Sequence, residues 1–180
     1  KTEFAIMSAR FGTSGLRGLA TELTDGTATL FTRAFARHLL HHGDAVPGLQ
    51  VLVGGDLRES SPVIMFHVCA GLQAEGLVPV DCGAIPTPAL AYAAMSRGLP
   101  AVMVTGSHIP AERNGLKFYR SSGEISKSDE TSIAFLTQDA DFAAPPTPCE
   151  LVEAREGLGE AFVSRFTSCF GGKALAGLRI

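Results

Sequence analysis

Short apolar runs alternate with longer segments of helical periodicity along most of the chain. In one helical segment Phe31, Phe35 and Leu39 recur at four-residue spacing, and Thr24 or Asp25 is a suitable N-cap for it. Elsewhere, runs of consecutive apolar residues are typical of strands that are buried on both faces of a sheet. The predicted strands cover residues 50–54, 77–82, 101–105 and 115–119, and the predicted helices cover residues 25–42, 61–76, 87–96 and 128–137.

The regular alternation of strands and helices predicts the fold class. It indicates an α/β fold with a mainly parallel mixed sheet that helices flank on both faces. The strand at 115–119 is expected to be antiparallel at an edge, joined to its neighbour by a turn at Asn114-Gly115. Ligands of such sheets gather beyond the carboxyl ends of the strands, so we expect functional residues in the loops after Val53, Cys82 and Val104.

The last forty residues differ from the rest in composition. A Pro-rich stretch at 143–149 is typical of a linker. A helix is predicted between residues 151 and 170, although Gly157 and Gly159 interrupt its pattern, and a strand begins at 178–180. We therefore expect a first domain at 1–142 and the incomplete start of a second α/β domain at 150–180.

Composition and charge narrow the possible classes of protein. The chain has 180 residues, 46% of them hydrophobic, which is enough for one domain with its own core. A net charge of -3 argues against nucleic-acid binding through charge alone. We find neither an apolar run of about 18 residues nor a signal peptide, so the expected location is the cytoplasm, with no membrane partner.

The segment Thr105 to Pro110 contains the most informative chemistry. Here a buried strand ends and a loop presents Ser107 and His108 together, after a glycine that permits an unusual backbone conformation or a close ligand approach. In this position Ser107 can be exposed, and His108 can hydrogen-bond a substrate or assist proton transfer. A polar turn whose side chains only bond to the backbone is a comparable interpretation.

Two further clusters combine glycine, hydroxyl groups and arginine. Residues 11–18 include Thr13, Ser14 and Arg17 among three glycines, and their backbone N–H groups can form an anion nest; a flexible loop is an equal alternative. In residues 54–61, Arg58 lies near the start of the next helix, where anions bind favourably. The alternative is that Asp56 and Arg58 pair with each other while the serines cap the helix.

Lysine and histidine residues provide the remaining candidates. Lys117 follows the turn at Asn114 and can point back toward Ser107 to bind phosphate or to act as a base; a solvated edge-strand lysine is the usual alternative. His38, His41 and His42 have metal-compatible spacing, but a stabilising position at a helix C-terminus explains them more simply. The sequence lacks an acidic cluster that would complete a Mg²⁺ site.

Taken in order, these motifs resemble the α-D-phosphohexomutase family, which includes phosphoglucomutase, phosphomannomutase and phosphoglucosamine mutase. The resemblance extends over residues 11–125. Its serine loop departs from the commonest pattern T-A-S-H-N-P, with Gly106 in place of Ala and Ile109 in place of Asn. The matching segments are Gly12 to Gly18, Gly54 to Ser61, Pro86-Thr87-Pro88, Thr105 to Pro110 and Asn114 to Lys117.

The resemblance implies a mechanism and a set of site residues. Ser107 would carry a phosphoryl group and bind Mg²⁺ through it, while an aspartate loop of a second domain supplies the other metal ligands. The phosphoserine would convert a hexose phosphate to a hexose 1,6-bisphosphate and regain the other phosphoryl group. The catalytic residues would be Ser107, His108 and Lys117, and the substrate- or phosphate-binding residues Thr13, Ser14, Arg17, Arg58 and Asn114.

The resemblance also implies partners and a substrate. The partners would be a hexose phosphate and the remaining mutase domains of the same protein. The serine loop looks most similar to bacterial phosphomannomutases, which makes mannose phosphate the first choice, with phosphoglucosamine mutase as the alternative. Because the site would span several domains, we expect the 180-residue chain alone to be inactive, as a phosphate-binding module without turnover.

Overall fold

The fold is built on one twisted sheet in a computed structural model that describes residues 8–138, 152–153 and 157–179. The sheet has eight strands in the order β1-β2-β6-β5-β3-β4-β8, and β7 pairs with β6 outside this order. The strands are β1 (Arg10–Phe11), β2 (Leu16–Leu19), β3 (Gln50–Gly55), β4 (Val78–Ala84), β5 (Ala101–Val104), β6 (Arg113–Arg120), β7 (Gly123–Glu124) and β8 (Val152–Glu153).

The sheet is mixed, as predicted, and its two halves differ. The half formed by β5, β3, β4 and β8 is parallel throughout. The half formed by β1, β2, β6 and β7 is antiparallel, and it joins the first half through the antiparallel pair β5–β6. Ala101–Val104 of β5 is completely buried, which agrees with a strand that helices cover on both faces.

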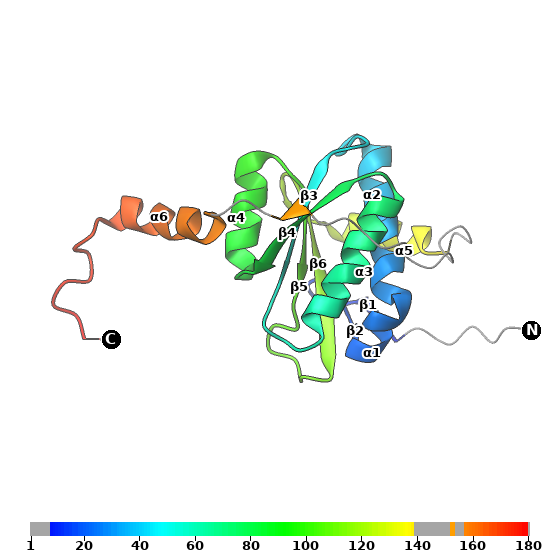
Figure 1. The fold of residues 1–180 in the computed structure, drawn as a ribbon, viewed down its shortest axis with the longest axis horizontal. Coiled ribbons are helices and arrows are strands. Elements are labelled where there is room, and N and C mark those ends of the chain that lie inside the picture. The colour runs from blue at the N-terminus through cyan, green and yellow to red at the C-terminus, as the bar shows by residue number, and fades with distance from the viewer. Residues whose placement is uncertain (1–7, 139–151, 154–156, 180) are drawn as a thin grey trace, which may run out of the picture.

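Helices cover both faces of the sheet (Figure 1). On one face α2 (Ala28–His42), α3 (Ser61–Ala74) and α5 (Lys127–Leu136) share a core with Val53, Val104 and Phe118. On the other face α4 (Thr87–Arg97) and α6 (Leu158–Phe170) share a smaller core with Leu52, Met103 and Tyr119. The prediction of an α/β fold with helices on both faces is therefore confirmed.

The start of α2 differs from the prediction. Neither Thr24 nor Asp25 caps it; instead α1 (Ala20–Glu22) and the π-helical turn η1 (Leu23–Thr27) precede it. The chain kinks at Asp25 and Gly26, and Gly26 has a φ of 98°. Since glycine adopts positive φ at no steric cost, this residue permits a kink that the apolar spacing alone does not reveal.

The position of β6 corrects two predictions. This strand lies inside the sheet between β2 and β5 instead of at an edge, and Asn114-Gly115 lies within it instead of forming a turn. A Cβ on Gly115 would lie 2.5 Å from the carbonyl oxygen of Leu16. Gly115 is therefore needed for the close approach of two strands rather than for a change of direction.

The C-terminal part contributes one short strand and one helix. Val152–Glu153 pairs in parallel with Val80 and Asp81 of β4. The helix predicted from residue 151 begins later, at Leu158, after Gly157 with a φ of 105°. Leu178 and Arg179 do not form the predicted strand. The linker at 143–149 lies outside the described residues, and the division into two domains stays a prediction.

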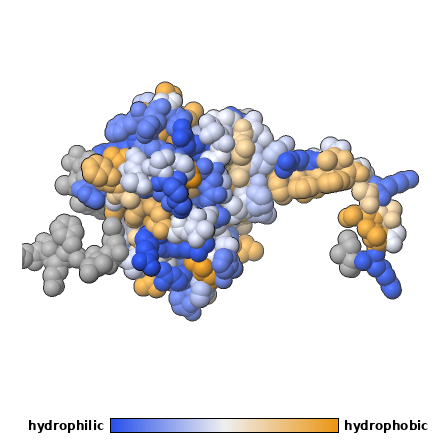
Figure 2. Space-filling view, turned by 180° about the vertical axis from the view of Figure 1, so that it is seen from behind, coloured by the Kyte–Doolittle hydropathy of each residue, from blue (hydrophilic) through white to orange (hydrophobic). Residues whose placement is uncertain are grey.

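The surface of α6 carries an apolar stripe, where Val163, Phe166 and Phe170 are exposed (Figure 2). The same stripe includes Phe162, whose ring packs against Phe166 of this helix and Tyr92 of α4. Among the described residues, no helix combines the length and the apolar character that crossing a membrane requires.

Candidate active site

The serine loop, residues 105–110, begins where β5 ends at the carboxyl edge of the parallel strands. Ser107 and His108 are both exposed there, and the Ser107 hydroxyl lies 3.4 Å from Nδ1 of His108. The backbone of Ser107 has a φ of 51°, the only positive φ outside glycine among the described residues. Such a conformation costs on the order of 1–3 kcal/mol and is typical of functional sites.

Asp56 holds the first part of the serine loop. Its Oδ2 accepts hydrogen bonds from Oγ1 of Thr105 at 2.9 Å and from the N–H of Gly106 at 3.0 Å. Its Oδ1 accepts from Oγ of Ser61 at 2.6 Å. Burial raises the pKa of this carboxyl, but these hydrogen bonds outweigh burial and hold the pKa below its ordinary value. Asp56 therefore stays ionised and serves as an acceptor, a role that sequence reasoning missed.

The Arg58 guanidinium lies behind the serine loop. Its Nε is 3.3 Å from Oδ2 of Asp56, so the alternative in which these two residues pair is confirmed. Its Nη atoms donate to four backbone carbonyl oxygens, so all five N–H groups face protein oxygens. These contacts engage the whole guanidinium with the protein, and the predicted phosphate contact of Arg58 stays a prediction. The four carbonyls belong to Pro110 (2.9 Å), Arg113 (3.2 Å), Ser107 (3.3 Å) and Ile109 (2.6 Å).

Asn114 is also committed to the protein. It is completely buried, and its amide nitrogen donates to the hydroxyls of Ser60 at 2.9 Å and Ser61 at 3.1 Å. Its side-chain oxygen accepts from the N–H of Gly115 at 2.9 Å. Asn114 thus joins β6 to the start of α3 beneath the loop, and its contact with a substrate stays a prediction.

Arg17 and Lys117 project from one face of the sheet beside the strand that enters the serine loop. Leu16 and Leu116 are paired and buried on the α2 face, so their neighbours in sequence, Arg17 and Lys117, point to the opposite face. Arg17 lies opposite Gly115, whose carbonyl oxygen accepts the N–H of Thr105 at 3.0 Å. The structure thus brings both cations to strands near the loop, while their contact with phosphate stays a prediction.

Thr13 and Ser14 lie in the β1–β2 turn, residues 12–15, which is directed away from the serine loop. The Ser14 hydroxyl donates to Oε1 of Glu124 at 2.6 Å, and Glu124 pairs with Tyr119 near the far end of β6. This carboxylate would repel a phosphate at the Ser14 hydroxyl, and phosphate binding by Ser14 stays a prediction. The Thr13 side chain is exposed, and its phosphate binding stays a prediction.

The histidines of α2 have structural partners. His38 is buried, with Nε2 3.0 Å from Oδ1 of Asp129 and Nδ1 3.1 Å from Oγ of Ser132. Its ring also packs on His42. Burial lowers the pKa of His38, and the nearby Asp129 only partly offsets this. These contacts attach α5 to α2. His41 and His42 lie in the last turn of α2, as predicted, whereas His38 lies one turn earlier and is buried.

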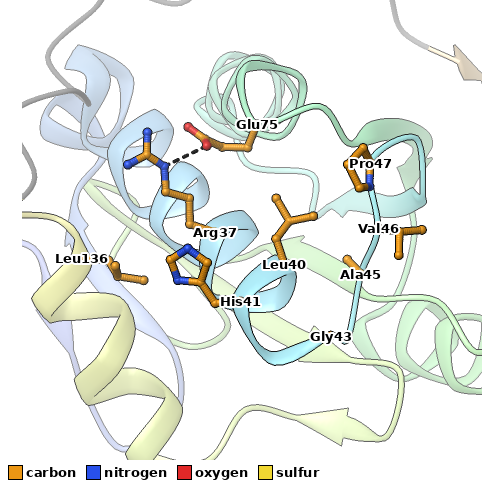
Figure 3. Close-up of a pocket in the computed structure, with 9 residues that line it drawn as sticks. All are labelled: Arg37, Leu40, His41, Gly43, Ala45, Val46, Pro47, Glu75 and Leu136. Carbon is orange, nitrogen blue, oxygen red and sulfur yellow. Dashed lines mark hydrogen bonds and ion pairs between the residues drawn. The ribbon is translucent and has the colours of Figure 1, made fainter.

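Two cavities lie near these elements. One of about 570 Å³ adjoins Asp56 and Arg58 at the carboxyl ends of β3 and β4. The other, of about 650 Å³, lies near the amino end of β3 and contains none of the predicted site residues (Figure 3). Arg37 on its wall is paired with Glu75 at 2.8 Å. Of these two cavities, the one at the carboxyl ends of β3 and β4 therefore lies beside residues that hold the serine loop.

Comparisons with known proteins agree with this arrangement. Residues 8–144 match the family model for phosphoglucomutase/phosphomannomutase, alpha/beta/alpha domain I. The chain is 45% identical over 177 residues to a phosphomannomutase of Sinorhizobium fredii, covering 97% of this chain and 37% of that protein. It is 35% identical over 164 residues to a phosphoglucosamine mutase of Clostridium botulinum, covering 89% of this chain and 36% of that protein.

A solved structure has the same fold. It comes from Thermus thermophilus and is named as a phosphomannomutase, and it superimposes with a TM-score of 0.80 at 30% sequence identity, covering 95% of this chain and 38% of that one. The chain thus spans less than two-fifths of the length of these relatives. Together, the family model and the fold show that the chain belongs to the α-D-phosphohexomutase family and carries its α/β/α domain I.

Proposed function

We propose that this chain is the phosphoryl-carrying part of a phosphohexomutase that interconverts hexose 1-phosphate and hexose 6-phosphate. The observation that carries the proposal is Ser107, exposed at the end of β5 with a φ of 51° on a loop that Asp56 and Arg58 hold from behind. Two cationic side chains on neighbouring strands, Arg17 and Lys117, support it.

The proposed reaction transfers one phosphoryl group at a time. A hydroxyl oxygen of the hexose phosphate bonds to phosphorus while the bond from phosphorus to Oγ of Ser107 breaks, which gives hexose 1,6-bisphosphate. The hydroxyl proton passes to a base of this chain, for which His108 and Lys117 are the candidates, and a proton passes from the protonated base to the departing Oγ of Ser107. The bisphosphate then reorients within the site and returns its other phosphoryl group to Ser107.

Charge neutralisation is the main task of the protein in such a reaction, because phosphoryl transfer depends on positioning and electrostatics more than on covalent chemistry. A phosphoserine carries about -1.5 to -2 charges at pH 7. Arg17 and Lys117 are the cations that we assign to this charge, since both project from the same face of the paired strands β2 and β6, and β6 pairs with the strand that enters the loop. Arg58 contributes indirectly, through the loop.

Mg²⁺ is part of the proposal, but this chain holds only a share of its site. Within residues 8–138, 152–153 and 157–179, no group of three His, Cys, Asp or Glu side chains is arranged to bind a metal. A phosphate on the exposed Ser107 would supply one of the oxygen ligands that Mg²⁺ prefers. The bound metal would offset phosphate charge.

Mannose phosphate is the first proposed substrate, and glucose phosphate is the second. The more similar of the two relatives described above is named a phosphomannomutase. The second candidate is phosphoglucosamine mutase activity, which the 35% identical relative from Clostridium botulinum favours. Both candidates use the same Ser107 chemistry, so only substrate kinetics separates them.

The test uses the full-length protein. We expect intact-mass and peptide mapping to find phosphate on Ser107, and we expect turnover of mannose 1-phosphate with hexose 1,6-bisphosphate as activator. Phosphate found only on another residue would overturn the assignment. Faster turnover of glucosamine phosphate would select the second candidate. The 180-residue chain assayed alone should not isomerise either sugar phosphate, and measurable isomerisation would contradict the proposed division of the site among domains.

A further inference from the structure

One ion pair holds the serine loop on both sides of Ser107. Asp56 accepts hydrogen bonds from Thr105 and Gly106, which precede the serine. Arg58 donates to carbonyl oxygens of residues 107, 109, 110 and 113, which begin at the serine and follow it. Asp56 and Arg58 come from the end of β3, so a segment about fifty residues earlier in the sequence sets the shape of the loop.

The backbone conformation of Ser107 needs such support. A side chain at positive φ is unfavourable unless the surrounding structure fixes it. Here Nη2 of Arg58 bonds to the carbonyl oxygens of Ser107, at 3.3 Å, and of Ile109, at 2.6 Å. The N–H of Ser107 donates to Oγ1 of Thr105 at 3.0 Å, and Thr105 is itself bonded to Asp56.

Gly106 leaves the space that the guanidinium fills. A Cβ on this buried residue would lie 2.6 Å from Nη2 of Arg58, and it would come closer still to Cζ and Nε. Atoms of a planar guanidinium with all its N–H groups bonded have no room to withdraw without losing those bonds. Gly106 and Arg58 therefore occupy one volume between them.

The consequence for charge is as important as the shape. The carbonyl oxygens that Arg58 binds carry partial negative charge, and they would repel a phosphate if they faced it. The guanidinium turns four of them toward itself. Its side chain is only 19% exposed and pairs with Asp56, so it stabilises the loop without being available to a ligand.

We propose that Arg58 is a positioning residue for the Ser107 nucleophile and that Gly106 and Arg58 form a fitted pair. This inference rests on the proposed phosphoryl transfer at Ser107. Arg58 acts through the loop and touches no substrate, so it affects the chemical step more than substrate binding.

The experiment compares variants of the full-length protein. Arg58→Met should lower kcat about 100-fold with KM changed less than about threefold, because misplacing the reacting group costs about that factor. Arg58→Lys should recover little of this loss, since one ammonium group cannot reach four carbonyl oxygens in the planar arrangement of the fork. Arg97→Met, which removes an exposed arginine in the last turn of α4, is the matched control and should leave kcat unchanged.

The fitted pair is tested by a double-mutant cycle. Gly106→Ala alone should lower kcat and the melting temperature. In the Arg58→Met background the same substitution should lower kcat and the melting temperature much less, because the added methyl group no longer meets the guanidinium. Additive losses would overturn the pair. A rise in KM with kcat unchanged in Arg58→Met would make Arg58 a ligand contact and overturn the positioning role. If the unsubstituted protein turned over no sugar phosphate, the proposed function would fail, and the melting-temperature cycle would still judge the pair.

Discussion

Two loops of this molecule share glycine, threonine and serine residues but have different surroundings. The β1–β2 turn and the serine loop both combine glycine with hydroxyl side chains. The Ser14 hydroxyl donates at 2.6 Å to the Glu124 carboxylate. The Ser107 hydroxyl is exposed, 3.4 Å from the imidazole of His108. A hydroxyl held by a carboxylate is a structural group, while an exposed one beside a possible base is open to chemistry.

The difference between the two loops comes from partners that are distant in sequence. Glu124 is 110 residues from Ser14, and Asp56 is 50 residues from Gly106. Lys127 further fixes the β1–β2 turn by donating to the carbonyl oxygen of Gly12 at 2.7 Å. In the β1–β2 turn the acidic partner, Glu124, binds the serine hydroxyl itself. In the serine loop the acidic partner, Asp56, binds the backbone behind Ser107.

The largest expected effect is a direct contrast of the two serines in the full-length protein. Ser107→Ala should reduce turnover at least about 10⁴-fold, because the group that carries the phosphoryl is removed. Ser14→Ala should change it less than about threefold, since its hydroxyl is held by Glu124. Steady-state kinetics with mannose 1-phosphate measures both. Equal losses in the two variants would remove the distinction between a structural and a chemical loop.

A smaller effect concerns the free energy of unfolding at acidic pH. The pKa of Asp56 is lowered in the folded state: burial raises it, and hydrogen bonds from Ser61, Thr105 and two backbone N–H groups outweigh burial. A lowered pKa means that the carboxylate contributes stability above its ordinary value of 3.8 and that this contribution is lost as the pH falls through the folded-state pKa. Asp56→Asn should therefore cost about 1–3 kcal/mol at pH 7.

Urea unfolding at pH 7, 5 and 3 measures this cost. The difference in free energy of unfolding between the parent protein and Asp56→Asn should persist at pH 5 and shrink at pH 3, below 3.8. Asp81→Asn is a suitable control, because Asp81 also accepts a hydrogen bond from a backbone N–H, that of Gly83 at 2.8 Å, but this bond lies outside the serine loop. A difference that stays constant with pH would mean that the Asp56 carboxylate charge does not hold the loop.

The sequence predicted the parallel half of the fold well and the antiparallel half poorly. Buried strands such as β5 appear as continuous apolar runs, and Pro62 and Gly98 mark a helix start and a helix end as the spacing suggests. The strands β1 and β2 have only two and four residues and lie beside a glycine-rich turn. Segments this short have no periodicity, and only the pairing of β1 with β2 and of β2 with β6 makes them strands.

The site follows the same division. The position of Ser107 beyond a buried strand was predictable, because strand ends in a parallel sheet face one edge. The roles of Arg58 and Asn114 were not, since the composition of a loop does not show whether its donors meet a ligand or a carbonyl oxygen. Gly106 is the residue in the sequence that could have indicated the role of Arg58, because a glycine beside the nucleophile leaves space that Arg58 fills.

The smallest expected effect lies on the other side of the comparison, at Lys127. Its ammonium group donates to the carbonyl oxygen of Gly12 and pairs with Glu130 at 2.7 Å, but the side chain is 66% exposed. Water screens such a pair, so Lys127→Met should cost less than about 1 kcal/mol in urea unfolding and leave kcat and KM within about twofold. Lys173→Met, an exposed position after α6, is the control. A tenfold loss of kcat would instead mean that the β1–β2 turn shapes the reaction as the serine loop does, because a surface ion pair could affect chemistry only through the backbone it holds.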